Sequence, residues 1–107
     1  MSDWSLYMIR TNNGDLYAGI SSDVQRRFAE HVAGGNKCAR YLRGKSPLRL
    51  VFSHNIGSRS DALKAEAAVK KLPKSAKEAL ISGHRSLQSL ISVETPLNKS
   101  DQIIEGE

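Results

Sequence analysis

Cysteine is almost absent from this sequence, because Cys38 is the only one among 107 residues. A lone cysteine cannot form an internal disulfide, so a reducing, cytoplasmic setting is the simplest interpretation. No apolar run approaches the roughly 20 residues of a membrane span, and no basic segment precedes the first apolar stretch, so we expect neither a transmembrane helix nor a signal peptide. The phosphate-binding glycine motif of a Rossmann unit is also missing. Three residues show no metal-ligand spacing and are interpreted as uninvolved: Cys38, His54 and His84.

The size and composition fit one ordinary globular domain. A chain of this length hides roughly two-thirds of its unfolded surface on folding, so it needs no disulfide or metal to be stable. Its share of hydrophobic residues, 39%, and of charged residues, 25%, is that of a soluble protein. The last residues are polar and acidic. We therefore expect a domain over 1–97 and a loose tail over 98–107.

Positive charge is concentrated in the middle of the chain. The net charge is +5, but residues 24–77 carry thirteen Lys and Arg against three acidic residues, a local net charge of +10. The two ends together are therefore acidic. This distribution suggests a polyanionic partner, with nucleic acid as the first candidate, although solvated surface lysines are the alternative.

The hydrophobic pattern predicts an α+β domain in which helices pack around three strands, the first two antiparallel. Asn12 to Asp15 form a strong turn signal between the first two strands, the first of which is expected to be central. A basic connector with one short helical turn is expected over 36–47. The expected strands cover 5–11, 16–21 and 48–54, and the expected helices cover 24–33, 61–72 and about 75–82.

Helix boundaries and faces follow from local signals. Asp23 or Ser22 is expected to cap the first helix, whose residues Val24, Phe28 and Val32 should face the sheet. Further signals are a turn at 56–57, a cap for the second helix at Ser58 or Ser60, and a capping box for the third helix over 75–78.

Arg27 and His31 are four residues apart and share one edge of the first helix, with Arg26 more exposed. Arg27 could clamp a phosphate with two hydrogen bonds, and His31 could hold a phosphate oxygen or move a proton. Taken alone, the two residues are better explained as a solvated charge and a histidine packed beside Phe28.

Glu66 interrupts an otherwise apolar stripe of the second helix. Burying a lone carboxylate is costly, so it should have a partner, such as a metal ion that also binds water. An ion pair with Lys70, four residues on, explains the same pattern equally well.

Tyr7 and Tyr17 lie on the two strands of the predicted hairpin, and their relative orientation depends on its loop. A two-residue loop would pair Tyr7 with Ile20 and put the tyrosines on opposite faces. A loop one residue longer or shorter puts them on the same face. A shared site in which a tyrosine moves a proton therefore predicts an odd loop or a bulge.

The connector mixes cations with one aromatic residue. Phosphate contacts and a stacking ring would suffice for binding nucleic acid without sequence preference. We nevertheless expect Tyr41 to be a core residue of the short helical turn. The candidate nucleic-acid-binding residues are Arg26, Lys37, Arg40, Arg43 and Lys45.

The ordered set of these residues resembles the GIY-YIG nuclease superfamily, in particular its small single-domain bacterial YhbQ-like group. Ser5-Leu6-Tyr7 stands at the first motif and Tyr17-Ala18-Gly19 at the second. The other motif positions are occupied by Arg27, His31 and Glu66. The similarity covers nearly the whole chain, from about residue 5 to 96.

The resemblance implies a three-stranded antiparallel sheet flanked by helices, and hydrolysis of phosphodiester bonds in DNA with one divalent metal ion. Tyr7 or Tyr17 would be the general base, or would orient the water through the other tyrosine. Arg27 would stabilise charge on the phosphate, His31 would assist positioning, and Glu66 would hold Mg²⁺ or Mn²⁺.

Two departures bear on function. Ile20 stands where some repair nucleases of the superfamily have a lysine that lowers the pKa of the tyrosine, so this help must come from elsewhere. A second, DNA-binding domain is also missing. The leading hypothesis is a DNA endonuclease, structure-selective or acting in repair or recombination. The alternative is a non-catalytic nucleic-acid-binding module of the same fold. Cutting both strands would be consistent with a homodimer, and the oligomeric state stays open.

Overall fold

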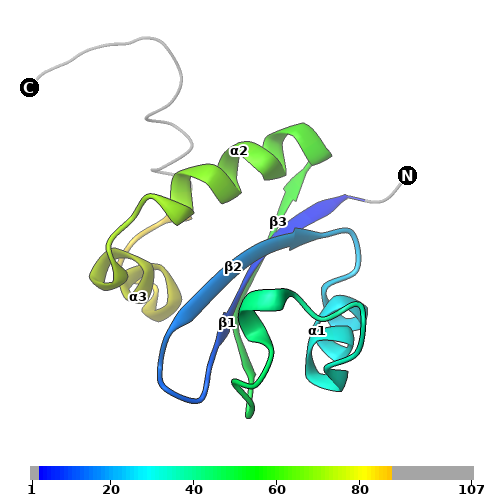
Figure 1. The fold of residues 1–107 in the computed structure, drawn as a ribbon. Coiled ribbons are helices and arrows are strands. Elements are labelled where there is room, and N and C mark those ends of the chain that lie inside the picture. The colour runs from blue at the N-terminus through cyan, green and yellow to red at the C-terminus, as the bar shows by residue number, and fades with distance from the viewer. Residues whose placement is uncertain (1–2, 88–107) are drawn as a thin grey trace, which may run out of the picture.

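The computed structural model describes residues 3–87 and contains a three-stranded sheet with helices on both faces (Figure 1). The strands are β1 (Trp4–Arg10), β2 (Leu16–Ser21) and β3 (Arg49–Gly57). The helices are α1 (Val24–Ala33), the single 3₁₀ turn η1 (Arg40–Leu42), α2 (Arg59–Lys70) and α3 (Lys74–Ser82).

The strand order is β2-β1-β3, and both neighbours of β1 run antiparallel to it. The predicted α+β class, the antiparallel sheet and the central place of the first strand are thus confirmed. The turn expected at Ile56-Gly57 is wrong, because β3 continues to Gly57, which pairs with Trp4. A bulge between Met8 and Ile9 shifts the β1–β3 register along the way.

The hairpin loop has an odd length. The amide of Thr11 donates to the carbonyl of Asp15 over 2.9 Å, which encloses a three-residue loop ending at Gly14 with φ of 89°. This register pairs Tyr7 with Gly19 and Ile9 with Tyr17. Since residues 17 and 19 share a face, Tyr7 and Tyr17 point to the same side of the sheet, as a shared site requires.

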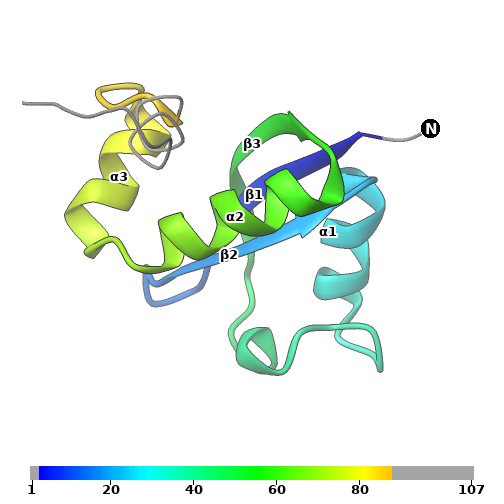
Figure 2. The ribbon, with the colours of Figure 1, turned by 90° about the horizontal axis from the view of Figure 1, so that it is seen from above.

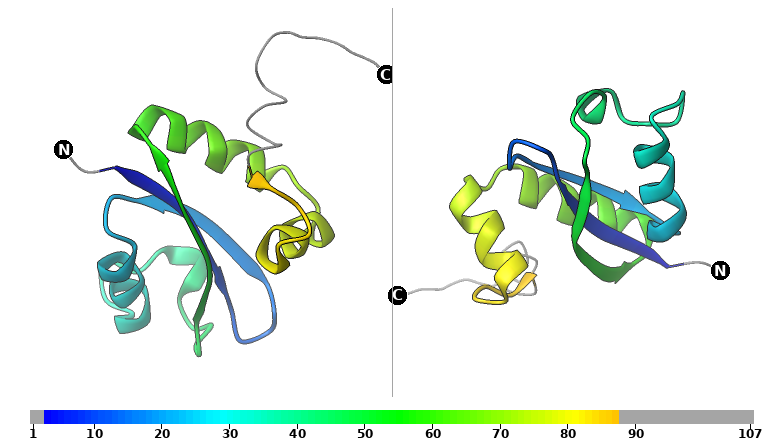
Figure 3. Two further views of the ribbon diagram at one scale, coloured as in Figure 1. Left: turned by 180° about the vertical axis from the view of Figure 1, so that it is seen from behind. Right: turned by 90° about the horizontal axis from the view of Figure 1, so that it is seen from below.

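Two hydrophobic clusters sandwich the sheet. Leu6 and Met8 face α2 and α3, where they pack with Val69 and Leu80. Tyr7 and Ile9 face the opposite side, which α1 and η1 cover (Figures 1 and 2). Seen from behind, the connector from α1 through η1 to β3 stays on the side of α1 (Figure 3). Alternation along β1 therefore assigns its side chains to two separate layers.

The buried face of α1 differs from the predicted one. Asp23 caps the helix by accepting from the amide of Arg26. Val32, expected to face the sheet, is 50% exposed, whereas His31 is 1% exposed. At 100° per residue, position 31 lies within about 20° of Val24, and position 32 lies about 80° away. Helical geometry therefore overrides the greater hydrophobicity of valine.

Ser58 caps α2, as one of the two predicted alternatives. The capping box expected over Ser75 to Glu78 is wrong, because α3 begins at Lys74 and Ser75 already lies inside it. Glu78 instead binds Arg10 through two hydrogen bonds of 2.6 and 2.7 Å. This bidentate pair joins α3 to the end of β1.

The part of the chain beyond residue 87 lies outside the described residues, and so do the expected tail over 98–107 and most of the segment 85–93. Among the helices of residues 3–87, none is long and apolar enough to cross a membrane.

Candidate active site

Tyr7 and His31 meet in the layer between the sheet and α1. The Tyr7 hydroxyl lies 3.0 Å from Nε2 of His31, and both side chains are almost fully buried, at 2% and 1% exposure. A polar pair buried to this extent must satisfy its own hydrogen bonds. Taken alone, His31 was interpreted as a histidine packed beside Phe28. In the structure it binds Tyr7, the tyrosine of the first motif, directly.

The main chain of the connector sets the proton position on this histidine. The amide of Ala39 donates to Nδ1 of His31 over 3.1 Å. Nδ1 must therefore be the unprotonated nitrogen, so Nε2 carries the proton and donates it to the Tyr7 oxygen. Burial lowers the pKa of His31, and the Arg27 charge lowers it further against the weaker effect of Glu30, so the imidazole is neutral.

Gly19 provides the space for the Tyr7 hydroxyl. A Cβ atom at position 19 would lie 2.6 Å from that oxygen and 2.7 Å from the ring carbon that bears it. The glycine of the second motif is thus required by the close approach of a side chain from the neighbouring strand.

Tyr17 completes an aromatic cluster with these residues. Its ring centroid lies 6.5 Å from that of Tyr7 and 5.7 Å from that of His31, within the range of favourable aromatic contacts. The structure therefore brings together three of the five predicted catalytic residues through ring contacts and one hydrogen bond.

Tyr41 extends this cluster outward. It stacks on Tyr17 with centroids 5.9 Å apart and ring planes at 17°. Nζ of Lys45 lies 3.5 Å from the centroid of the Tyr41 ring, and the Tyr41 hydroxyl donates to Asp15 over 3.3 Å. The expectation that Tyr41 is a core residue is wrong, since it is 43% exposed. Leu42 takes the buried place in η1 because the short turn directs only one of its side chains inward.

Arg27 lies at the edge of the cluster. Its Nη1 donates to Glu30 over 3.0 Å and to the carbonyl of Lys37 over 2.6 Å. Its charge and a side-chain hydrogen-bonding interaction also act on the Tyr7 hydroxyl and lower its pKa. The guanidinium is thus held in place with donors to spare.

Glu66 lies at the margin of the buried stripe of α2, which Ala62, Ala65 and Val69 form. Its side chain is 19% exposed and pairs with Lys70 over 3.3 Å, so the ion pair that the sequence allowed is present. The Glu66 charge nevertheless acts on Tyr7. The described residues 3–87 hold no group of three or more His, Cys, Asp or Glu side chains that could hold a metal ion.

The Tyr7 hydroxyl resists losing its proton. Burial, followed by the effects of Tyr17 and Glu66, raises its pKa from 10.0 to about 12, although Arg27 acts in the opposite direction. A negative oxygen at Tyr7 therefore requires further positive charge nearby.

The predicted nucleic-acid-binding residues are spread around α1 and the connector. Lys37 contacts Glu30 only at 3.9 Å, Arg43 donates to the carbonyl of Gly35 over 3.2 Å, and Lys45 covers Tyr41. Arg26 and Arg40 are exposed. These cations flank the aromatic cluster on the α1 side of the sheet.

Three residues were interpreted as having no part in a metal or catalytic site, and in the described part of the chain none of them makes a polar contact with the aromatic cluster. His54 is exposed and stacks on Phe52, His84 bonds Ser82, and Cys38 is buried in the core on the α1 side. Sequence reasoning missed the Ala39 amide and the stacking by Tyr41. The amide leaves no trace in the sequence, whereas the aromatic ring among the connector cations was a visible signal.

Comparison with known proteins agrees with this arrangement. A family model described as the GIY-YIG catalytic domain matches residues 3–79. The UPF0213 protein YhbQ of Escherichia coli (strain K12) is 49% identical over 102 residues, which cover 94% of this chain and all of YhbQ. A UPF0213 protein of Cronobacter sakazakii is 48% identical over 97 residues, or 90% of this chain and all of that protein.

Two solution NMR structures are similar to this fold. The UPF0213 protein BH0048 of Bacillus halodurans has 29% identity and a TM-score of 0.50, covering 90% of this chain and 99% of its own. The protein EF2693 of E. faecalis has 27% identity and a TM-score of 0.55, covering 92% and 96%. The family match spans β1 to α3 and includes every residue of the aromatic cluster. The chain therefore belongs to the GIY-YIG family, and its function is of the nuclease type.

Proposed function

We propose that this chain is a divalent-metal-dependent endonuclease that hydrolyses phosphodiester bonds in DNA. The observation that carries the proposal is the buried hydrogen bond between Tyr7 and His31, with Tyr17 in ring contact and the charges of Arg27 and Glu66 acting on the same hydroxyl. The chain thus supplies groups that can move a proton, hold a phosphate and bind a cation, and the charges of Arg27 and Glu66 both act on the Tyr7 oxygen.

Tyr7 is the general base in this proposal. Its oxygen accepts from Nε2–H of His31. Once the hydroxyl has lost its own proton to solvent, the phenolate oxygen can take a proton from the attacking water. The neutral histidine cannot take that proton through Nε2, which already carries one, so it serves to hold and stabilise the tyrosine oxygen. With its pKa at about 12, Tyr7 needs additional positive charge to work near neutral pH.

Arg27 holds the scissile phosphate. Glu30 and the Lys37 carbonyl fix one end of its guanidinium, and the remaining donors can reach a phosphate oxygen. An arginine that is already immobilised loses less side-chain entropy when the substrate binds.

Glu66 fits Mg²⁺ or Mn²⁺ only as a shared ligand. Mg²⁺ is often bound by one or two carboxylates, several waters and substrate phosphates, and the partly buried Glu66 supplies one such carboxylate. When bound, the ion would offset charge on the phosphate and the leaving oxygen. The ion pair with Lys70 holds this carboxylate in one orientation until an ion binds.

The basic connector supports DNA as the partner, and branched substrates would connect the activity to repair or recombination. A homodimer would supply two sites for a duplex. The second candidate is a non-catalytic nucleic-acid-binding module, which is favoured by the high pKa of Tyr7 and by the pairing of Glu66 with Lys70.

A cleavage assay separates the two candidates. Purified protein is incubated with single-stranded, duplex and branched DNA, with Mg²⁺, Mn²⁺ or EDTA, beside Glu66→Gln. Asp61→Asn is the matched control because it removes an exposed carboxylate from the same helix. We expect metal-dependent cutting that Glu66→Gln abolishes and Asp61→Asn preserves, with DNA binding retained by both. Binding without cutting by the unmodified protein would instead establish the binding module.

A further inference from the structure

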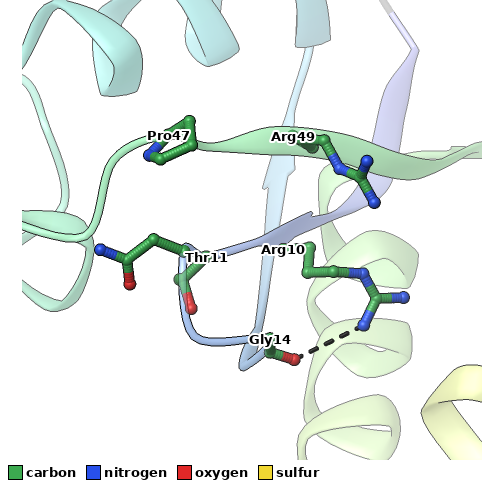
Figure 4. Close-up of a pocket in the computed structure, with 6 residues that line it drawn as sticks. Arg10, Thr11, Gly14, Pro47 and Arg49 are labelled. Atoms are coloured by element: carbon green, nitrogen blue, oxygen red, sulfur yellow. Dashed lines mark hydrogen bonds between the residues drawn. The ribbon is translucent and has the colours of Figure 1, made fainter.

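A second cluster of positive charge surrounds a shallow hollow at the hairpin end of the sheet, apart from the tyrosine cluster. The hollow has a volume of about 300 Å³ and lies between the end of β1, the hairpin loop and the start of β3 (Figure 4). Arg10 and Arg49 line it, and Figure 4 shows their guanidinium groups extending toward the same side.

The two arginines are direct partners in the antiparallel β1–β3 pairing. Like charges in such opposite positions repel each other and destabilise a sheet. Glu78 compensates one of them, because it binds Arg10 through both of its oxygens. The side chain of Arg49 is exposed and makes no ion pair or hydrogen bond within residues 3–87.

A third cation adds to the uncompensated positive charge of Arg49. Nζ of Lys74, at the start of α3, would lie 3.7 Å from a Cβ atom at Gly14, which lines the hollow. Three cations therefore surround the hollow with one carboxylate among them. An anion with several oxygens would offset the remaining charge and could use the planar guanidinium of Arg49.

The hollow is connected to the tyrosine cluster by the main chain. Arg10 points to the side of α3, opposite to Tyr7, so the two sites lie on different faces of the sheet. The hairpin loop binds the connector between them, since Asn12 donates to the carbonyls of Lys45 and Ser46. Lys45 on one face and Arg49 on the other are four residues apart, at most about 14 Å of extended chain. Positive charge thus continues around the hairpin end.

We propose that the Arg49 hollow is a second phosphate-binding site, which takes a backbone phosphate of the nucleic acid some nucleotides away from the bond held at Tyr7. This proposal rests on the proposed function, because it assumes that the chain binds nucleic acid. It deepens that function by assigning the direction in which the bound strand leaves the site, past Lys45 and around the hairpin.

The test is the salt dependence of DNA binding, measured by fluorescence anisotropy in EDTA so that no cutting occurs. Removing one phosphate contact should make the slope of log K against log salt less steep by about 0.9. We expect this change, with a several-fold loss of affinity, for Arg49→Met. Lys64→Met, which removes an exposed cation from α2, should leave the slope unchanged.

Arg49→Glu is a second variant with a distinct expectation. A glutamate opposite Arg10 replaces repulsion with attraction, so the variant should unfold at the same or a higher temperature while it binds DNA more weakly than Arg49→Met. Equal slopes for Arg49→Met and Lys64→Met, with tight binding by the unmodified protein, would overturn the second site and leave the nuclease proposal intact. No binding of DNA by the unmodified protein would overturn both.

Discussion

His31 donates through Nε2 to the hydroxyl of Tyr7 over 3.0 Å, across a layer that joins the central strand to the first helix. Because Nδ1 of the same ring accepts from the Ala39 amide, His31 connects three separate segments of the chain. Its replacement should therefore affect folding as well as chemistry.

His31→Ala leaves the Tyr7 hydroxyl and the Ala39 amide without their buried partners and creates a cavity. We expect the free energy of unfolding to fall by about 2–4 kcal/mol, measured by urea denaturation. His31→Gln can restore the bond to Tyr7 and should lose less. Equal losses in the two variants would show that packing, rather than the hydrogen bond to Tyr7, dominates at this position.

Gly19→Ala should be destabilising although an alanine is acceptable to the strand backbone. The added Cβ would lie 2.6 Å from the Tyr7 hydroxyl, and overpacking of this kind costs about 1–3 kcal/mol. Gly35→Ala is the matched control, because nothing lies within 4 Å of its added Cβ. Thermal unfolding of the two variants measures the difference. A neutral Gly19→Ala would mean that Tyr7 can move away from His31 without cost.

The stability of the fold should fall at alkaline pH because of Tyr7. Its pKa is raised to about 12 in the folded state from about 10 in the unfolded chain, so the folded state retains the proton more strongly. This contribution is fully present below about pH 10 and is lost as pH rises from about 10 to 12. At about 1.4 kcal/mol per pH unit, the loss approaches 2–3 kcal/mol.

Urea unfolding at pH 9 and pH 11 tests this expectation, with Tyr7→Phe as the reference for all other groups that titrate there. The unmodified protein should lose more stability between the two pH values than Tyr7→Phe does. Parallel losses would place the Tyr7 pKa near its ordinary value.

Tyr41→Ala should remove the ring that stacks on Tyr17. We expect a stability loss of about 1 kcal/mol and a lower kcat with little change in KM, since Tyr17 loses a contact that holds its ring. Tyr41→Phe preserves the stacking and loses only the bond to Asp15, so it should resemble the unmodified protein. A rise in KM alone would indicate that Tyr41 contacts the substrate instead.

Much of the fold could be predicted from the sequence, because strands, turns and helix caps leave local signals. Whether Tyr7 and Tyr17 share a face of the sheet depends on a difference of one residue in the length of the hairpin loop. The turn signal over Asn12 to Asp15 is compatible with either loop length. The structural role of His31 could not be predicted from the helix pattern, because the two groups that bind its ring lie on other segments of the chain. Arg10 and Glu78 are 68 residues apart, so no local pattern indicates their ion pair.

The Ala39 amide has a consequence for how this site tolerates sequence change. A main-chain donor is supplied by nineteen of the twenty amino acids, so drift at position 39 leaves the proton on the same imidazole nitrogen. Proline alone cannot supply it, and the φ of −59° at this position already suits a proline ring. Replacing Ala39 with proline would thus remove the hydrogen bond to Nδ1 and let the His31 imidazole exchange between its two tautomers. Every side chain of the GIY-YIG motifs would stay unchanged.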